Sequence, residues 1–375
     1  MPKRQVYLVP GFFGYESLGA FNYFLRVKEV LKQDLANLGC EAEVIDCATQ
    51  PTGSIRRRAL RLINEIVEDG GLDADEIYLI AHSTGGLDSR LVLTPGVRLC
   101  PDETEARLAG KTRALVTVAT PHFGTPLATF FTTFAGRQVL QFLTGMALSG
   151  PGRSSILAGV RLATAIVTYG DRVGIRESTL DYWAQNLLRF ICKSPDNEIW
   201  TFLSEVASDQ GAIIQLTPEG TDLFNSAVTD RDGVEYRCLI TAAPPPPARS
   251  YRGIKVGLLP AAALFEILYR IAAKEHSHYP YPHDPKGAST QIEARLPFAL
   301  NAKTSYGIVP TLSQIHGEVL DVVVADHLDI VGQFPNACGR PEADWLPSGA
   351  PFGETEFQRT WQRVAEFIAA TANGR

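Results

Sequence analysis

The chain lacks several features that mark common classes of protein. Its six cysteines include no C-x-x-C pair, which argues against a zinc ribbon or a thioredoxin-like motif. Lysine and arginine cluster only at residues 56–58 with Arg61, a run that we expect on the solvated face of a helix, so no nucleic-acid partner is predicted. The net charge of −6 and the 45% hydrophobic content instead indicate a globular protein with a sizeable core.

Long apolar runs are also missing. The nearest to a membrane span, residues 253–273, contains three charged residues and a proline, so it predicts a helix that packs against protein and no transmembrane segment. At the N-terminus, residues 1–4 lead directly into a strand pattern and leave no room for the apolar core of a signal peptide. We therefore expect a cytoplasmic protein, or a secreted one if a leader has been removed.

The first third of the sequence contains a regular alternation of strand and helix patterns. The expected strands are 5–9, about 42–48, 76–81 and about 113–119, and the expected helices are about 21–38, 54–68 and 85–93. This alternation predicts a mostly parallel sheet with helices on both faces, which binds ligands at the carboxyl ends of its strands. Later elements are expected at 234–240, about 251–274, 318–324 and about 356–371.

We interpret residues 1–375 as a single domain that carries a helical insertion. Between about 125 and 300, long helical segments rich in apolar residues interrupt the alternating pattern. They predict a cap or lid over the sheet. An apolar cap is suited to an acyl chain or another apolar substrate, and it would allow weak contact with a lipid surface.

The motif Ala-His-Ser-Thr-Gly-Gly occupies residues 81–86, between a buried-strand pattern and a helix pattern. A nucleophile elbow needs this context, because a tight turn must present the serine at the N-terminal end of a helix. The small residues Ala81 and Gly85 allow the turn to close without a side-chain clash. Ser83 is therefore the predicted nucleophile.

A serine hydroxyl must transfer its proton to a base, and an acyl-transfer site must bind an oxyanion. His327 is the predicted base, because it follows the strand 318–324 on the same edge of the sheet as Ser83 and comes after the serine in the chain. The predicted oxyanion donors are the backbone amides of Phe12 and Thr84. Gly11 allows the chain to turn and frees the Phe12 amide.

Four segments in this order, residues 9–12, 81–86, 120–125 and 326–329, resemble the motifs of bacterial triacylglycerol lipases and esterases of the α/β-hydrolase superfamily. Pro10 departs from the histidine that stands in the first of these motifs. The resemblance implies an α/β-hydrolase fold and hydrolysis of a small-molecule or lipid ester through an acyl-enzyme. Two alternatives stay open: acyl transfer to an alcohol or amine, and a catalytically weakened binding protein.

The resemblance places the carboxylate of the catalytic triad within residues 304–310, where this chain has Tyr306. A phenol is neutral at pH 7 and cannot stabilise an imidazolium as a carboxylate does. Three explanations stay open. Another carboxylate serves, the enzyme works as a Ser-His dyad, or Tyr306 is a lesion that Tyr306→Asp should repair with a rise in turnover. The candidate substitutes are Asp284, Glu318 and Asp321.

The resemblance also suggests a calcium site beside the histidine loop, although no cofactor is expected to be required. Asp329 and Gln333 match the two positions that it implies. Calcium binds carboxylate and carbonyl oxygens, so the chemistry of these side chains is suitable. Hydrogen bonds that brace the His327 loop are the alternative role for the same two residues.

Overall fold

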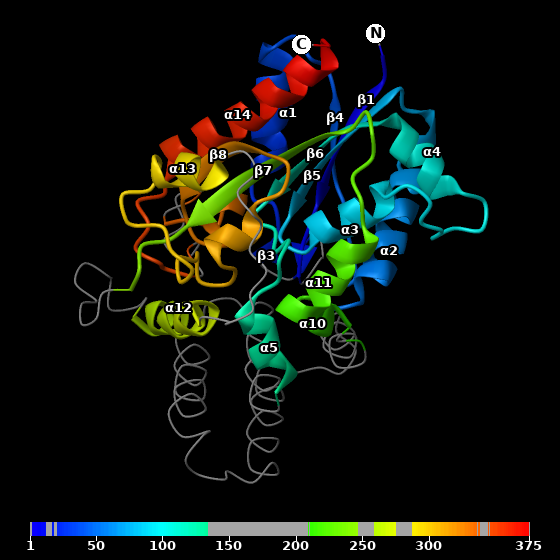
Figure 1. Ribbon diagram of the computed structural model, residues 1–375. Helices are drawn as coiled ribbons and strands as arrows, with labels where there is room; N and C mark the ends of the chain where they lie inside the picture. The colour runs from blue at the N-terminus through cyan, green and yellow to red at the C-terminus, as the bar shows by residue number, and fades with distance from the viewer. Residues whose placement is uncertain are drawn as a thin grey trace, which may run out of the picture.

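The computed structural model describes residues 2–12, 17–18, 21–133, 209, 211–246, 259–274, 287–335, 337, 344 and 346–374. Six strands form one sheet in the order β4-β1-β5-β6-β7-β8, and every neighbouring pair is parallel (Figure 1). Their bounds are β1 (Arg4–Val9), β4 (Glu43–Asp46), β5 (Glu76–His82), β6 (Thr112–Val118), β7 (Glu235–Ala242) and β8 (Glu318–Val324).

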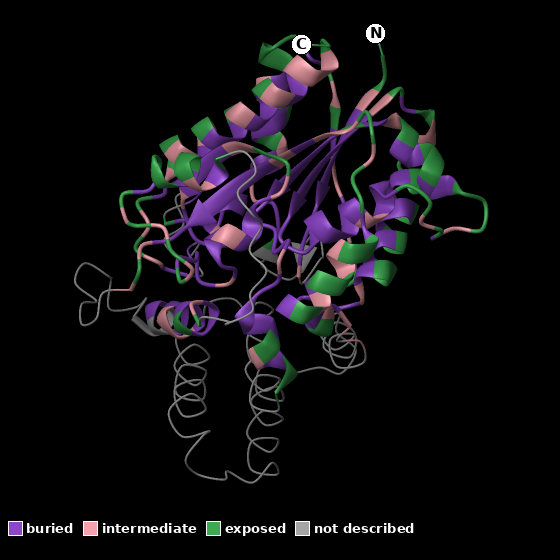
Figure 2. Ribbon diagram, viewed as in Figure 1, coloured by how far each residue is buried: buried purple, intermediate pink, exposed green. Residues whose placement is uncertain are grey.

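Helices cover both faces of this sheet (Figure 1). On one face α1 (Val27–Asn37) packs against α14 (Glu354–Ala372), and on the other lie α2 (Ile55–Glu68), α3 (Gly85–Leu93) and α4 (Thr104–Lys111). The alternation of side chains along β1 explains both layers, because Val6 and Leu8 join the core beneath α1 and α14, whereas Tyr7 and Val9 join the core beneath α2 to α4. The strands are accordingly buried on both faces (Figure 2).

The remaining described elements are a ribbon, further helices and short helical turns. A two-stranded antiparallel ribbon pairs β2 (Ser17–Leu18) with β3 (Phe21–Asn22). Beyond the carboxyl ends of the strands lie α5 (Pro126–Thr132), α10 (Gly211–Gln215) and α12 (Leu259–Ala272), as Figure 1 shows. The other helices are α11 (Pro218–Ala227), α13 (Ala288–Glu293) and the short 3-10 turns η1 (Gly71–Asp73), η3 (Thr311–Gln314) and η4 (Asp329–Val331).

The strand pattern of the sequence predicted this sheet well. Each of the six expected strands is present, with ends that differ by no more than about two residues from those expected. The helix expected from residue 21 begins only at Val27, because residues 21–22 pair in the ribbon instead. Of the predicted cap, the structure describes helices toward both ends, but residues 134–208 lie outside the described part of the chain. The cap therefore stays a prediction. No helix among the described residues is long and apolar enough to span a membrane.

Candidate active site

Ser83 lies at the carboxyl end of β5, on the sharp turn into α3. Its φ of 55° is in the left-handed region, which costs a residue with a side chain about 1–3 kcal/mol and so requires support from its surroundings. The Ser83 amide donates a hydrogen bond of 2.8 Å to the Val118 carbonyl of the neighbouring strand. A Cβ on Gly86 would lie 2.3 Å from the Thr120 Oγ1. The turn therefore closes only because Gly86 has no side chain.

The loop after β1 packs directly against this turn. A Cβ on Gly11 would lie 2.5 Å from the Ser83 Cβ, and one on Gly85 would lie 2.6 Å from the Val9 carbonyl oxygen. Both close approaches depend on glycine. The two segments that carry the predicted oxyanion donors, the loop after β1 and the start of α3, thus meet at Ser83.

A buried arginine sets the orientation of the loop after β1. Arg58 is fully buried and donates hydrogen bonds to the carbonyl oxygens of Pro10, at 2.9 Å, and Gly11, at 3.0 Å. It also pairs with Asp88 at 2.9 Å. Because a trans peptide places its N–H opposite its C=O, the Phe12 amide points away from Arg58. The expectation that residues 56–58 lie on a solvated face is therefore wrong for Arg58, whose side chain is fully buried.

Burial also affects the carboxylate that pairs with Arg58. Desolvation raises the pKa of Asp88 to about 6, and the charge of Arg58 opposes this rise. An uncompensated charge at this depth would be costly. Arg58 and Asp88 are thus a matched pair that joins α2, α3 and the loop after β1.

Tyr23 connects the same loop to the residue before the nucleophile. The Gly11 amide donates to the Tyr23 hydroxyl at 2.8 Å, and that hydroxyl lies 2.8 Å from His82 Nδ1. The Gly11 amide is therefore engaged, and the oxyanion role of the next amide along, that of Phe12, stays a prediction. The other predicted donor belongs to Thr84, at the start of α3, where the first amides of a helix have no partner within the helix.

His327 lies in the loop after β8 and reaches the nucleophile turn through His82. The two imidazole rings have centroids 4.5 Å apart at an interplanar angle of 36°. No hydrogen bond joins Ser83 and His327 among the described residues; catalytic hydrogen bonds are often long before a substrate binds. Burial lowers the pKa of His327 to about 3, so its imidazole is neutral at pH 7.

The inner nitrogen of the His327 ring has no carboxylate partner in the described part of the chain. Its Nδ1 atom is buried without any hydrogen-bond partner there. Of the candidate acids, Glu318 is at the opposite end of β8 and pairs with Arg237 at 2.7 Å, and Asp321 pairs with Arg363 at 3.4 Å. Asp284 lies outside the described residues.

Tyr306 instead lies against the flat face of this imidazole. The phenol and imidazole rings are nearly parallel, at 6°, with centroids 5.1 Å apart. The phenol is fully buried, and its hydroxyl donates to the Ala119 carbonyl at 2.8 Å. The residue at the expected position of the triad acid is therefore in contact with the histidine, but through its ring.

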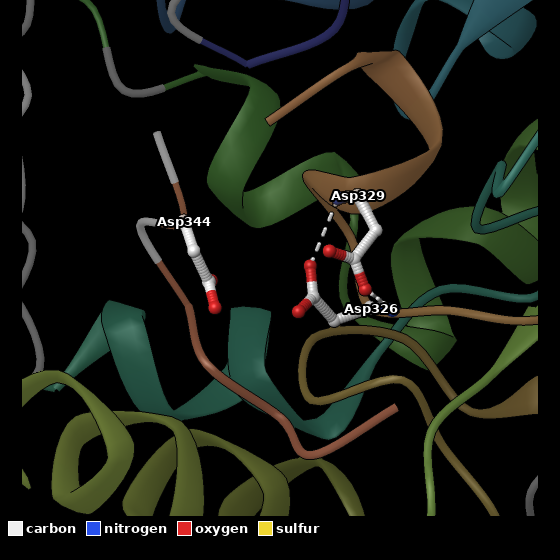
Figure 3. Close-up of side chains that lie close together, drawn as sticks. All are labelled: Asp326, Asp329 and Asp344. Carbon is white, nitrogen blue, oxygen red and sulfur yellow. Dashed lines mark hydrogen bonds between the residues drawn. The ribbon is translucent and has the colours of Figure 1, made fainter. Parts of the chain in front are cut away.

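Three carboxylates gather beside the histidine loop, as Figure 3 shows. Asp326, Asp329 and Asp344 are all buried, and each offers an oxygen that lies within 4.8 Å of the others. Of the two residues predicted to bind calcium, Asp329 is in this cluster. The Gln333 side chain donates through Nε2 to the Asn22 carbonyl at 2.6 Å, a tether to the ribbon. Sequence spacing gave no signal for Asp344, which follows Asp329 by 15 residues.

Hydrogen bonding leaves the carboxylate cluster only partly satisfied among the described residues. Asp326 Oδ2 and Asp344 Oδ1 are buried and have no hydrogen-bond partner there. Burial raises the pKa of Asp326 to about 6, and burial together with the charge of Asp326 raises that of Asp344 to about 8. Converging carboxylate oxygens of this kind fit a hard cation such as calcium.

The parallel sheet, with Ser83 after its third strand in spatial order and His327 after its last, defines an α/β-hydrolase fold. No protein-family model and no curated protein sequence matches the chain. Lipase 1 from Pelosinus fermentans is similar in structure, with a TM-score of 0.54, 15% sequence identity, and coverage of 98% of this chain and 99% of that one.

Two further solved structures resemble the chain over nearly its whole length. EstA from Clostridium botulinum has a TM-score of 0.51 at 18% identity and covers 98% of this chain and 88% of its own. Staphylococcus hyicus lipase has a TM-score of 0.51 at 13% identity, with coverage of 100% and 97%. At these identities the similarity establishes the shared fold.

Proposed function

We propose that this protein is a serine hydrolase that cleaves carboxylic esters through an acyl-enzyme intermediate. The observation that carries the proposal is the φ of 55° at Ser83, on a strand-to-helix turn that lies beside His327. Strain of this kind persists where the surrounding structure enforces it, and it is concentrated at active sites. Two of the similar solved structures are named as lipases, which supports the same class of reaction.

In the proposed mechanism, Ser83 Oγ attacks the ester carbonyl carbon while the outer nitrogen of His327 accepts the hydroxyl proton. The carbonyl oxygen becomes negatively charged and is bound by the amides of Phe12 and Thr84. The imidazolium then donates its proton to the departing alcohol as the C–O bond breaks. Water repeats the sequence on the acyl-enzyme and releases the carboxylic acid.

The proposed catalytic pair is a Ser83–His327 dyad, because no described carboxylate reaches His327. In a serine protease, disabling the triad aspartate lowers turnover by about 10⁴, so we expect slow turnover relative to an enzyme with a complete triad. The substrate we propose is a small-molecule or lipid ester with an apolar acyl group. Apolar side chains on α5 and α12, such as Phe131 and Phe265, support this proposal because these helices lie beyond the carboxyl edge of the sheet.

We also propose that Asp326, Asp329 and Asp344 hold a calcium ion. When bound, the ion would supply positive charge to three buried carboxylates. The residues themselves brace the loop that carries His327, since Asp329 Oδ2 accepts from the Asp326 amide at 2.9 Å and Asp326 Oδ1 accepts from the Leu328 amide at 2.9 Å. The proposed role is therefore structural, with no step of the reaction at the ion.

The proposed activity is tested by hydrolysis of p-nitrophenyl esters from short to long acyl chains, with Ser83→Ala as the matched control. We expect turnover that Ser83→Ala abolishes, and the preferred chain length reports the size of the acyl site. An added alcohol separates hydrolysis from acyl transfer through the ratio of acid to new ester. Turnover that is equal in the two proteins on every ester would contradict the proposal and favour a hydrolase-like binding protein.

A further inference from the structure

We propose that Tyr306 is a positioning residue whose ring, through offset parallel stacking, fixes the orientation of the His327 imidazole in place of a triad carboxylate. The inference rests on the proposed function, since it assigns a partner to the base of that reaction. It goes beyond that function because it makes the tyrosine a working part of the site.

The first argument is the geometry of the two rings. A triad carboxylate orients its histidine by accepting a hydrogen bond from Nδ1, but here the buried Nδ1 has no partner among the described residues. The stack at 5.1 Å and 6° is an offset parallel arrangement, which aromatic rings favour over a direct overlay. The phenol therefore restricts rotation of the imidazole about the bond that joins the ring to its Cβ. The His82 ring also packs against the imidazole, with the two centroids 4.5 Å apart.

The second argument is that the tyrosine is tied to the same backbone as the nucleophile. Its hydroxyl donates to the carbonyl of Ala119, the residue after β6. The preceding residue, Val118, accepts the hydrogen bond from the Ser83 amide. Ser83 and the Tyr306 ring are thus hydrogen-bonded to two consecutive residues, Val118 and Ala119. These two bonds set the distance between nucleophile and base.

The loop that carries Tyr306 is itself held in place. Gly307 has a φ of 102°, and a Cβ at this position would lie 2.6 Å from the Phe265 ring of α12. The Ser305 hydroxyl accepts from the Gly307 amide at 3.0 Å and donates to the Val309 carbonyl at 3.1 Å. Because both the backbone and the hydroxyl are fixed, the phenol cannot swing away from the imidazole.

This arrangement also argues against Tyr306 as a lesion. A carboxylate in its place would be shorter than the phenol, would lose the stack, and would be placed in a fully buried position that now supplies a hydrogen-bond donor to a carbonyl. Restoring the expected acid should therefore not raise turnover, which is opposite to the expectation from the sequence alone.

The test compares Tyr306→Phe, Tyr306→Leu and Tyr306→Asp with the parent protein. Each is assayed for kcat and KM on a short p-nitrophenyl ester and for the rate at which a fluorophosphonate labels Ser83. Tyr306→Phe keeps the ring and should lose less than about tenfold in kcat, the scale of one net hydrogen bond. Tyr306→Leu and Tyr306→Asp should lose about a hundredfold in kcat and in labelling rate, as misplaced catalytic groups do, with KM nearly unchanged.

Tyr7→Leu is the matched control. Tyr7 is also fully buried, and its hydroxyl donates to Gln5 Oε1 at 3.0 Å, but it belongs to the core on the other face of the sheet. The Tyr7→Leu variant should have a lower melting temperature, as Tyr306→Leu should. Its kcat, measured well below both melting temperatures, should stay at the parent value. If Tyr306→Leu does not fold, Tyr306→Met takes its place.

Two results would overturn the inference alone: parent-like labelling of Ser83 in the leucine or methionine variant, or a rise in kcat for Tyr306→Asp. Failure of Ser83 in the unmodified protein to react with the fluorophosphonate has a different meaning. It would overturn the proposed function and the role of Tyr306 together.

Discussion

The two halves of the candidate site differ in what holds their loops and charged groups. On the nucleophile side, the Ser83 amide, the Gly11 amide and the carbonyls of Pro10 and Gly11 all have hydrogen-bond partners, and Arg58 is paired with Asp88. Four buried side-chain atoms on this side have no partner among the described residues: His82 Nε2, Thr84 Oγ1, Asp88 Oδ1 and Ser89 Oγ. On the histidine side, several buried groups have no hydrogen-bond partner among the described residues: His327 Nδ1, Asp326 Oδ2 and Asp344 Oδ1.

This difference separates groups that the protein's own hydrogen bonds and ion pairs hold in place from groups that need a further interaction. A buried polar atom without a partner costs about 1–3 kcal/mol, and more when it is charged. On the nucleophile side the backbone groups of the turn and loop are hydrogen-bonded and Arg58 is paired with Asp88, so we expect the geometry of these groups to be intrinsic to the fold. The histidine side relies on ring stacking and, we propose, on a cation. Four predictions test this contrast.

The largest effect is expected from breaking the buried pair on the nucleophile side. Arg58→Ala leaves Asp88 buried without its partner and frees the Pro10 and Gly11 carbonyls, so it should lower the free energy of unfolding by about 3–5 kcal/mol. Urea denaturation measures this change. Arg57→Ala is the control, because Arg57 is 66% exposed and its pair with Asp209 should contribute less than about 1 kcal/mol. Equal losses in the two variants would show that Arg58 does not anchor the loop.

The next effect is expected at the contact between Gly11 and the nucleophile. In Gly11→Ala the new methyl would lie 2.5 Å from the Ser83 Cβ, and relieving this overlap should cost about 1–3 kcal/mol and move the oxyanion loop. We expect ester turnover to fall by about a hundredfold, since small displacements of catalytic groups have effects of that size.

Gly110→Ala provides the control for the glycine variant. Gly110 lies in α4, and a Cβ there would meet nothing within 4 Å. Alanine should stabilise the helix by about 0.5–1 kcal/mol and leave turnover unchanged. Turnover in Gly11→Ala that matches that of Gly110→Ala would mean that the loop after β1 has no part in the reaction.

On the histidine side, stability should depend on pH and on calcium. The pKa values of Asp326 and Asp344 are raised to about 6 and about 8 in the folded protein, so the folded state binds more protons than the unfolded state between about pH 4 and pH 8. In a chelator, the melting temperature should therefore fall as the pH rises through this range. Added calcium should raise it most at pH 8, where the carboxylates are charged.

Asp344→Asn sharpens this prediction because it removes one negative charge from the cluster. In a chelator at pH 8 it should raise the melting temperature by about 2 °C relative to the parent, and it should reduce the response to calcium. Differential scanning calorimetry with calcium or chelator gives both numbers. A parent protein that responds identically to calcium and to magnesium at every pH, or to neither, would leave the three carboxylates without the proposed ligand.

The smallest effect is expected from Tyr23→Phe. The phenyl ring keeps the packing, but the Gly11 amide and His82 Nδ1 lose the hydroxyl that joins them. We expect a loss of about 1 kcal/mol in the free energy of unfolding and a decrease in kcat of less than tenfold. A decrease as large as that of Gly11→Ala would instead indicate that the hydroxyl contacts the substrate.

The sequence by itself determined the sheet and the two segments that carry Ser83 and His327. Strand and helix patterns are local, because side-chain period and turn residues fix them within a few positions. The order of β5, the turn and α3 could therefore be predicted, together with the strand that precedes His327. The oxyanion roles of the Phe12 and Thr84 amides come from the same local reasoning and stay predictions.

Only the tertiary structure decided what surrounds these residues. Arg58 looked solvent-exposed because its neighbours in the sequence are charged, but its side chain is bound by Asp88 of α3 and by the Pro10 carbonyl of the loop after β1. Asp344 joins Asp326, and Tyr306 stacks on His327, through contacts that no spacing encodes. A triad acid, a cation site or a ring stack depends on which side chains converge in space, and that convergence is set by packing of the whole core.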